Sequence, residues 1–214
     1  MKKILMLGFE PFDKSSLNPA LEAIKLLDNK KLNGGKIITA SLPVVHQKSI
    51  DKAIEEINKH KPDVVICVGL AGGNFGISIE RIAINIDDFR IQDNEGNQII
   101  DEPVVKDASA AYFSTLPIKA IVKELHDNGL PANVSNSAGT YVCNHIFYGV
   151  QHYIKDNNLD IKSGFIHIPL LPEQIKSENT PSMSLALITK ALSIASQATI
   201  DNETDIKMEA GTIF

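Results

Sequence analysis

Apolar residues recur along the chain with two different spacings, and segments of the two kinds follow one another. Near-continuous apolar runs at 4–9, 64–68 and 164–168 are typical of strands buried on both faces of a sheet. Further strands are predicted at 37–45 and within 131–136. Helical spacing predicts helices at 19–28, 47–59, 118–128 and 182–196. This alternation predicts a single α/β domain, a three-layer sandwich whose mostly parallel, twisted sheet carries helices on both faces.

The segment from about 89 to 117 is less regular than the rest. It contains the turn-like sequence Asp93-Asn-Glu-Gly96, which predicts a hairpin, and it also contains Pro103 and Pro117. We expect this segment to be an excursion from the core of the 1–214 domain. Such a segment would cover a site or contact a partner subunit.

Composition excludes several classes of partner. With 43% hydrophobic and 22% charged residues, the 214-residue chain is long enough for one substantial core. The net charge is −5, which argues against nucleic acid and against anionic membrane surfaces. The first apolar run stops at Glu10-Pro11, too early for a secretion signal, and the 2 cysteines form no C-x-x-C pair. These features predict a cytoplasmic protein.

A cysteine near a predicted helix start is the first candidate for chemistry. Apolar residues from Ile146 to Ile154 follow helical spacing, and Thr140 is the expected N-cap. Cys143 would then lie in the first helical turn, where free backbone N–H groups and the helix dipole favour a nucleophilic thiolate. The alternative is that Cys143 is a small buried apolar residue, as most free cysteines are.

Glu80 is the candidate acid. It alternates in phase with three isoleucines that predict one apolar strand face, Ile82, Ile84 and Ile86. A carboxylate on such a face needs a partner, because burial without one is costly. The alternatives are a break in the strand register at Glu80, or a structural ion pair with Arg81 or Arg90.

His167 is the candidate base, because it ends a predicted strand just before a proline-rich loop. In a parallel sheet, sites gather at the carboxyl ends of the strands. Cys143, His167 and Glu80 together would supply a nucleophile, a base and a group that orients the base.

Metal and cofactor signals are weak. Gly69–Gly76 matches neither the dinucleotide-binding fingerprint nor a phosphate-binding loop. His145 and His152 alone supply too few ligands to indicate a zinc site. The sequence therefore predicts no metal and no cofactor. His46 is expected on a solvated surface, and the Asp87-Asp88 pair at the edge of a loop.

Ordered motifs spread over nearly the whole chain resemble the type I pyroglutamyl peptidases, a family of cytosolic cysteine peptidases. The motifs are Gly8-Phe-Glu-Pro-Phe12 with Asn18-Pro19, Gly69-x-Ala-Gly-Gly73, Glu80-Arg-x-Ala-x-Asn85, Asp87-x-x-x-Ile91, Ser137-Ala-Gly-Thr-Tyr-Val-Cys-Asn144 and His167-x-Pro. This ordered set is far more specific than any one motif.

The resemblance implies a function and a set of roles. Cys143 would be the nucleophile, His167 the base and Glu80 the residue that orients the base. The substrate site, for a peptide with an N-terminal pyroglutamyl residue, would involve Phe9, Phe12, Asn18, Leu70, Arg90, Ile91, Tyr141 and Val142. Within it the backbone near Leu70 would bond the lactam, and Arg90 would lie beside the oxyanion. The family also implies a homo-oligomer, usually a tetramer.

Two positions depart from the family pattern, which commonly has Gln at the position of Leu70 and Arg at that of Asn74. Two other functions stay open at this stage. One is a different thiol-dependent amidase acting on a small amide. The other is a non-catalytic metabolite-binding α/β module in which Cys143 is buried.

Overall fold

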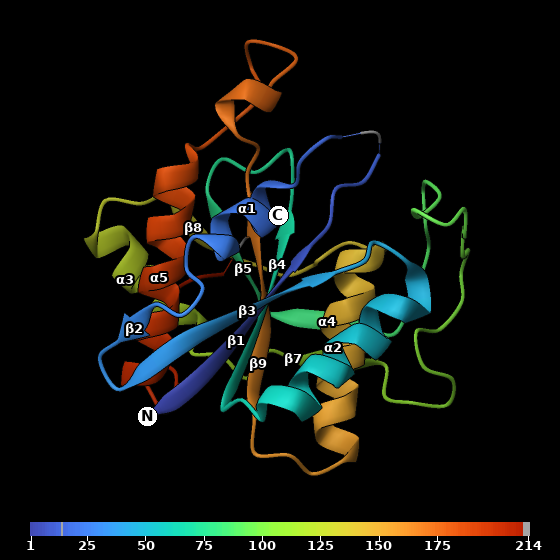
Figure 1. Ribbon diagram of the computed structural model, residues 1–214, viewed down its shortest axis with the longest axis horizontal. Coiled ribbons are helices and arrows are strands. Elements are labelled where there is room, and N and C mark those ends of the chain that lie inside the picture. Colours follow the sequence, from blue (N-terminus) through green and yellow to red (C-terminus); the bar gives the residue numbers. More distant parts are fainter. Residues whose placement is uncertain (14, 212–214) are drawn as a thin grey trace.

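A computed structural model describes residues 1–13 and 15–211, and these residues form a seven-stranded central sheet (Figure 1). Its strands β3, β1, β4 and β9 run parallel, whereas β2 and β5 are antiparallel to their neighbours β3 and β9. In sheet order the strands are β2 (Lys31–Leu32), β3 (Gly35–Leu42), β1 (Lys2–Phe9), β4 (Val64–Leu70), β9 (Lys162–Ile168), β5 (Ile77–Glu80) and β8 (Ala132–Ser135). The predicted α/β fold with a mostly parallel sheet is confirmed.

Helices cover both faces of the sheet, which gives three layers (Figure 1). One face packs against α1 (Pro19–Lys25), α3 (Ile118–Asp127) and α5 (Leu185–Asp201). The other face packs against α2 (His46–His60) and α4 (Val142–Asp156).

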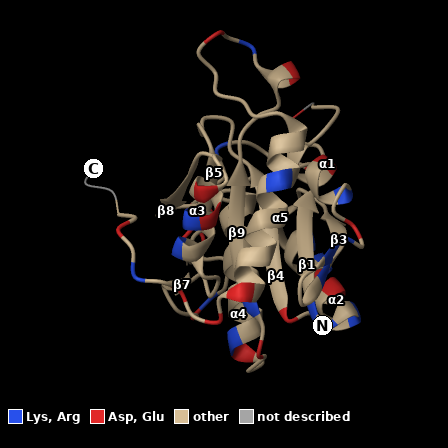
Figure 2. Ribbon diagram, turned by 90° about the vertical axis from the view of Figure 1, so that its left-hand side faces the viewer, with Lys and Arg blue, Asp and Glu red and all other residues tan. Residues whose placement is uncertain are grey.

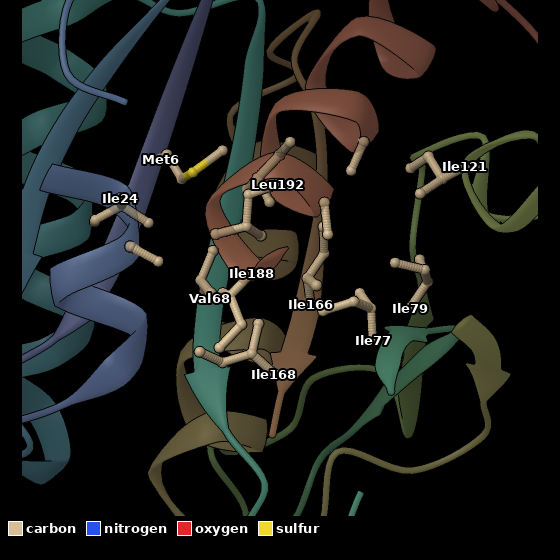
Figure 3. Packing of buried hydrophobic residues seen from close by; sticks show 14 of the residues in the cluster. Met6, Ile24, Val68, Ile77, Ile79, Ile121, Ile166, Ile168, Ile188 and Leu192 are labelled. Carbon is tan, nitrogen blue, oxygen red and sulfur yellow. The ribbon is translucent and has the colours of Figure 1, made fainter. Parts of the chain in front are cut away.

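Alternate residues of the buried strands serve the two cores. On β9, Ile166 and Ile168 point toward α5, where Ile188 and Leu192 meet them (Figure 3). Phe165 points the other way, into the core under α2 and α4. Burying a side chain of this size contributes about 1.5–3 kcal/mol, so the two cores hold the strand ends firmly in place.

Two hydrogen bonds from one side chain fix the first βα connection. The side chain of Asn18 caps α1, because its Oδ1 accepts from the backbone N–H of Ala20 at 3.0 Å, and Pro19 occupies the first helical position. The Asn18 Nδ2 also donates to the carbonyl of Glu10 at 3.2 Å. These bonds hold the loop after β1 against the carboxyl edge of the sheet.

The strand face predicted from Glu80 through Ile86 is wrong in its extent. β5 ends at Glu80, and Ile82–Ile84 forms a separate strand, β6, which pairs with β7 (Ala111–Phe113) outside the main sheet. The chain leaves the sheet at Arg81, so residues before and after it do not share one face. The break in register that the sequence left open is therefore present, although it comes after Glu80.

Helix starts also differ from prediction. α4 is capped at Tyr141 and begins at Val142, one residue later than a Thr140 cap would give. The Thr140 hydroxyl instead donates to the carbonyl of Asp88 at 2.8 Å. α5 begins at Leu185, after the capping Ser184, and continues to Asp201. Helical spacing of apolar residues locates a helix, whereas the loop contacts of a cap fix its first residue.

The excursion after β6 lies beside α2 and α4 in Figure 1. The side chain of Asn85 bonds both the N–H and the carbonyl of Val105, at 2.9 and 2.8 Å. The fully buried Tyr148 of α4 donates to the carbonyl of Ser109 at 2.5 Å. These contacts fasten the excursion to the layer that carries Cys143.

Candidate active site

The three predicted catalytic residues meet at the edge of the sheet where the parallel strands end. Cys143 lies in the first turn of α4, His167 is the penultimate residue of β9, and Glu80 is the last residue of β5. In the β5–β9 pair, Ser78 lies opposite His167. Glu80 is two residues beyond Ser78, so its side chain projects from the same face as the imidazole.

Glu80 and His167 form a buried pair. The Oε1 of Glu80 lies 2.8 Å from the Nδ1 of His167, and the two residues are 1% and 5% exposed. The Oε2 of Glu80 is buried and has no hydrogen-bond partner among the described residues. Because Nδ1 is held by Glu80, the other ring nitrogen, Nε2, is the one available to the thiol.

Charge at this site favours a protonated imidazole. Burial lowers the pKa of His167, but the charge of Cys143, its hydrogen bond to the ring, and the bond and charge of Glu80 together raise that pKa to about 10. At neutral pH the ring is therefore an imidazolium. An imidazolium next to the sulfur stabilises the thiolate, which is the nucleophilic form of cysteine.

Glycine at position 69 allows the thiol to approach the sheet. A Cβ atom at Gly69 would lie 2.9 Å from the Sγ of Cys143 and 2.7 Å from the ring of Phe165. Gly69 also pairs with His167 across β4 and β9. The bare backbone thus leaves room for the sulfur directly beside the imidazole, a role that the sequence pattern did not reveal.

An apolar cavity opens beside Cys143. Six of the predicted substrate residues line it together with Val44 and the cysteine: Phe9, Phe12, Asn18, Leu70, Tyr141 and Val142. The rings of Phe12 and Tyr141 are 6.5 Å apart, and Phe89 supports Tyr141 from behind at 4.7 Å. Val44 and Phe89 were missed, although Val44 comes just after β3 at the same carboxyl edge as the other wall residues.

Arg90 and Ile91 are not among the residues that line this cavity. Arg90 is exposed, and its expected place beside an oxyanion stays a prediction. The segment they belong to is nevertheless close, because the Tyr141 hydroxyl donates to the carbonyl of Gln92 at 3.1 Å. Burial, followed by the charge of Asp93, raises the pKa of Tyr141 to about 12, so this hydroxyl keeps its proton.

A second buried cluster lies behind the cavity wall. The Oδ2 of Asp87 is 3.0 Å from the Nε2 of His46 and 2.7 Å from the Nδ1 of His145. Asp87 and His145 are fully buried. The expectation of a loop-edge Asp87 is therefore wrong, because contacts between distant segments bury it. His46 is only partly buried, but Asp87 is its partner, so it is not the surface residue without a partner that was expected.

The same three residues are the group, among the described residues, whose donor atoms could hold a metal ion; these atoms lie within 4.8 Å of one another. One nitrogen of each imidazole is at hydrogen-bond distance from the Oδ2 of Asp87, whereas the Oδ1 of Asp87 and the Nε2 of His145 are buried without a partner among the described residues. The cluster is separate from Cys143, His167 and Glu80.

The surface matches the composition. In Figure 2 acidic and basic residues are interspersed over the exposed helices, without a continuous basic strip on the face shown. Within the described residues, no helix is both long and apolar enough to cross a membrane.

Comparisons with known proteins agree on one family. The pyroglutamyl peptidase family model matches residues 2–202. The pyrrolidone-carboxylate peptidase of Vibrio campbellii is 56% identical over 213 residues, covering 100% of both chains. The crystal structure of pyroglutamyl peptidase I from Bacillus amyloliquefaciens superposes with a TM-score of 0.94 at 46% identity, covering 96% of this chain and 100% of that one. The pyrrolidone carboxyl peptidase of Thermococcus litoralis gives a TM-score of 0.94 at 41% identity, covering 98% and 100%. The chain belongs to the pyroglutamyl peptidase family.

Proposed function

We propose that this protein is a cysteine peptidase that removes an N-terminal pyroglutamyl residue from peptides, with Cys143 as nucleophile, His167 as acid and base, and Glu80 as the residue that positions His167. The observation that carries the proposal is the buried 2.8 Å bond between Glu80 and His167, next to a cysteine that opens onto an uncharged cavity. Membership of the family supports the same substrate.

The first step is attack of the Cys143 thiolate on the carbonyl carbon that joins pyroglutamate to the next residue. The sulfur–carbon bond forms, and the carbonyl electrons move to its oxygen. Backbone N–H groups at the start of α4 are placed to stabilise this oxyanion, since the first turn of a helix has free donors. Among the described residues no side chain caps α4 at Tyr141, which keeps these donors available.

The second step needs an acid. The His167 imidazolium gives its proton to the leaving nitrogen, the carbon–nitrogen bond breaks, and the peptide leaves with a new amino terminus. A thioester then joins pyroglutamate to Cys143. Neutral His167 takes a proton from water, the resulting hydroxide attacks the thioester, and free pyroglutamate and the thiolate are released.

The cavity explains the selectivity for pyroglutamate. Its lining is mostly aromatic and aliphatic, and its polar side-chain groups, among the described residues, are the amide of Asn18, the hydroxyl of Tyr141 and the thiol of Cys143. A neutral lactam fits this surface, whereas an ordinary amino terminus would bring an unpaired ammonium group into it. The substitution at Leu70 keeps that wall apolar.

Assembly and location belong to the same proposal. We expect a homo-oligomer, a tetramer by family resemblance, in the cytoplasm. Large exposed side chains on the excursion and its β7 strand support an interface there, because Ile100 and Phe113 are 61% and 66% exposed. Light scattering after size-exclusion chromatography measures the mass; a monomer at micromolar concentration would contradict the expectation.

The substrate assignment is tested by turnover. Purified protein should release a fluorescent amine from its pyroglutamyl amide, and leave the prolyl and glutaminyl amides almost untouched. The prolyl compound has the same ring without the lactam carbonyl and therefore serves as the matched control. Comparable turnover of the two ring compounds would contradict the proposal.

A further inference from the structure

A second hollow lies next to the catalytic residues, on the side away from the apolar cavity. It is an open groove of about 620 Å³, with side chains that are mostly small and polar. Its floor and rims include Gly73, Asn74, Ser78, Asn133, Ser135 and Ser137. Gly73 and Ser137 belong to the family motifs, but the proposed chemistry uses none of the residues that line this groove.

Strand register ties the groove to the catalytic residues. Gly69 on β4 pairs with His167 on β9, His167 pairs with Ser78 on β5, and Ser78 pairs with Asn133 on β8. Side chains that are paired across neighbouring strands project from the same face of the sheet. The row therefore runs from the wall beside Cys143, past the imidazole, directly into the groove.

The two hollows lie on opposite sides of the reacting atoms. The apolar cavity lies where β1 and β4 end, at Phe9 and Leu70, and the groove lies over β5 and the edge strand β8. Leu70, the last residue of β4, lines the cavity, and Gly73, three residues later in the following loop, lines the groove. A peptide with its first ring in the cavity therefore has the groove in line beyond its scissile bond.

We propose that this groove binds the peptide on the leaving-group side of the scissile bond, as an extended segment of about three residues. The inference rests on the proposed function and adds to it a binding site for the residues beyond that bond. Neighbouring strands are about 4.8 Å apart and an extended residue spans about 3.3 Å, so the two strand spacings from His167 to Asn133 correspond to about three residues.

The groove carries the chemistry to bind backbone amides. The Nδ2 of Asn74 donates to the Oγ of Ser78 at 2.9 Å, and that hydroxyl donates to the Oδ1 of Asn133 at 3.1 Å. This chain of bonds orients two side-chain amides, which can each donate to and accept from a peptide group.

The absence of charged side chains in the described lining of the groove predicts weak selectivity for the residues after the scissile bond. Among the described residues that line it, none carries an acidic or basic side chain. The family pattern commonly has arginine at the position of Asn74, so this chain has a neutral amide where a cation is usual. Acidic, basic and neutral residues after the scissile bond should therefore be cleaved with similar efficiency.

Substrate length provides the test. The specificity constant kcat/KM is measured for pyroglutamyl peptides carrying one, two, three and four alanines before a C-terminal amide, alongside the pyroglutamyl fluorescent amide. We expect kcat/KM to rise about tenfold from one alanine to three, as one or two net hydrogen bonds supply, and then to level off. No gain beyond the first alanine would overturn the inference.

Two variants test whether the rise of kcat/KM with substrate length depends on the groove. Gly73→Leu fills the groove without straining the fold, because a Cβ at Gly73 meets no atom within 4 Å. Asn133→Ala removes an amide from the groove. Both should lower the ratio of kcat/KM for three alanines to that for one. Asn58→Ala on α2, far from the groove, is the control and should leave that ratio unchanged.

The outcomes separate the two claims. The inference is supported if the fluorescent amide is cleaved, kcat/KM rises with substrate length, and both groove variants reduce that rise. If kcat/KM rises with substrate length but neither variant alters that rise, the peptide binds elsewhere. This result overturns the inference and leaves the proposed function standing. If no pyroglutamyl substrate of any length is cleaved, the proposed function fails, and the inference fails with it.

Discussion

The carboxylate of Glu80 and the imidazole of His167 lie 2.8 Å apart, and both side chains are almost wholly shielded from solvent. The Arg81 guanidinium, which the sequence offered as an alternative partner for Glu80, instead binds the Oδ1 of Asn136 at 2.8 Å. Glu80 therefore acts on the ring that faces Cys143. This bond orients the ring and favours its protonated form.

Glu80→Gln tests that relationship. The amide keeps the shape and can still hydrogen-bond, but it removes the charge that stabilises the imidazolium. We expect kcat to fall about 100-fold or more, with a smaller change in KM, because the lost interaction matters most in the transition state. A normal kcat combined with a lowered melting temperature would make Glu80 a structural residue instead.

The pH profile gives a second test. The pKa of His167 is raised to about 10 in the folded protein, from the ordinary histidine value of 6.5. Between these two pH values the folded protein therefore keeps a proton that the unfolded chain releases. The stabilisation from this proton is complete below pH 6.5 and is lost as pH rises through about 10. We expect kcat/KM to fall on the alkaline side with a midpoint near that value. In Glu80→Gln the midpoint should move to lower pH; an unmoved midpoint would contradict the assigned partner.

Gly69→Ala tests the close approach of the thiol. The new methyl group would meet the Sγ of Cys143 at 2.9 Å and the ring of Phe165 at 2.7 Å, so the sulfur must move away from its place beside the imidazole. Reacting groups that are displaced by about 1 Å can lose about 100-fold in rate. Gly72→Ala is the matched control in the same glycine-rich segment, because its new methyl group meets Leu170 only at 3.5 Å, an ordinary contact distance. Equal kcat values for the two variants would contradict the packing argument.

The buried cluster of His46, Asp87 and His145 has a structural role in this account. Asp87→Asn replaces an acceptor of two imidazole bonds, and we expect the free energy of unfolding to fall by about 1–3 kcal/mol. Denaturant unfolding measures this change. A chelator should leave the melting temperature and kcat of the unmodified protein unchanged. A loss of stability on chelation, reversed by zinc, would instead make the cluster a metal site.

Much of the fold could be predicted, because buried strands and amphipathic helices leave a direct periodic pattern. The positions of Cys143 and His167 could be inferred from the same pattern, since each lies at an element boundary on one edge of the sheet. The sequence indicated that Glu80 is buried because it alternates in phase with three isoleucines of a predicted strand. That argument fails, because the strand ends at Glu80. Its burial comes from its place between β9 and β8, which no local pattern encodes.

The features that the sequence could not reveal depend on contacts between distant segments. His46 and Asp87 are 41 positions apart, and their bond forms only because α2 and the segment after β6 both pack beside α4. The groove over β5 and β8 has the same origin. Its row of paired residues exists because β5 reverses direction beside β9, a reversal that the apolar run alone does not predict.

The most direct test of the central claim is to trap the acyl-enzyme. The protein is mixed with a reactive pyroglutamyl ester, quenched in acid within the first turnover, and mapped by peptide mass spectrometry. The account predicts the added mass of one pyroglutamyl group on Cys143. The other thiol, Cys67, is an internal control: burial raises its pKa well above the usual range, and it should stay unmodified. Turnover without any adduct on Cys143, or an adduct on another residue, would contradict the account.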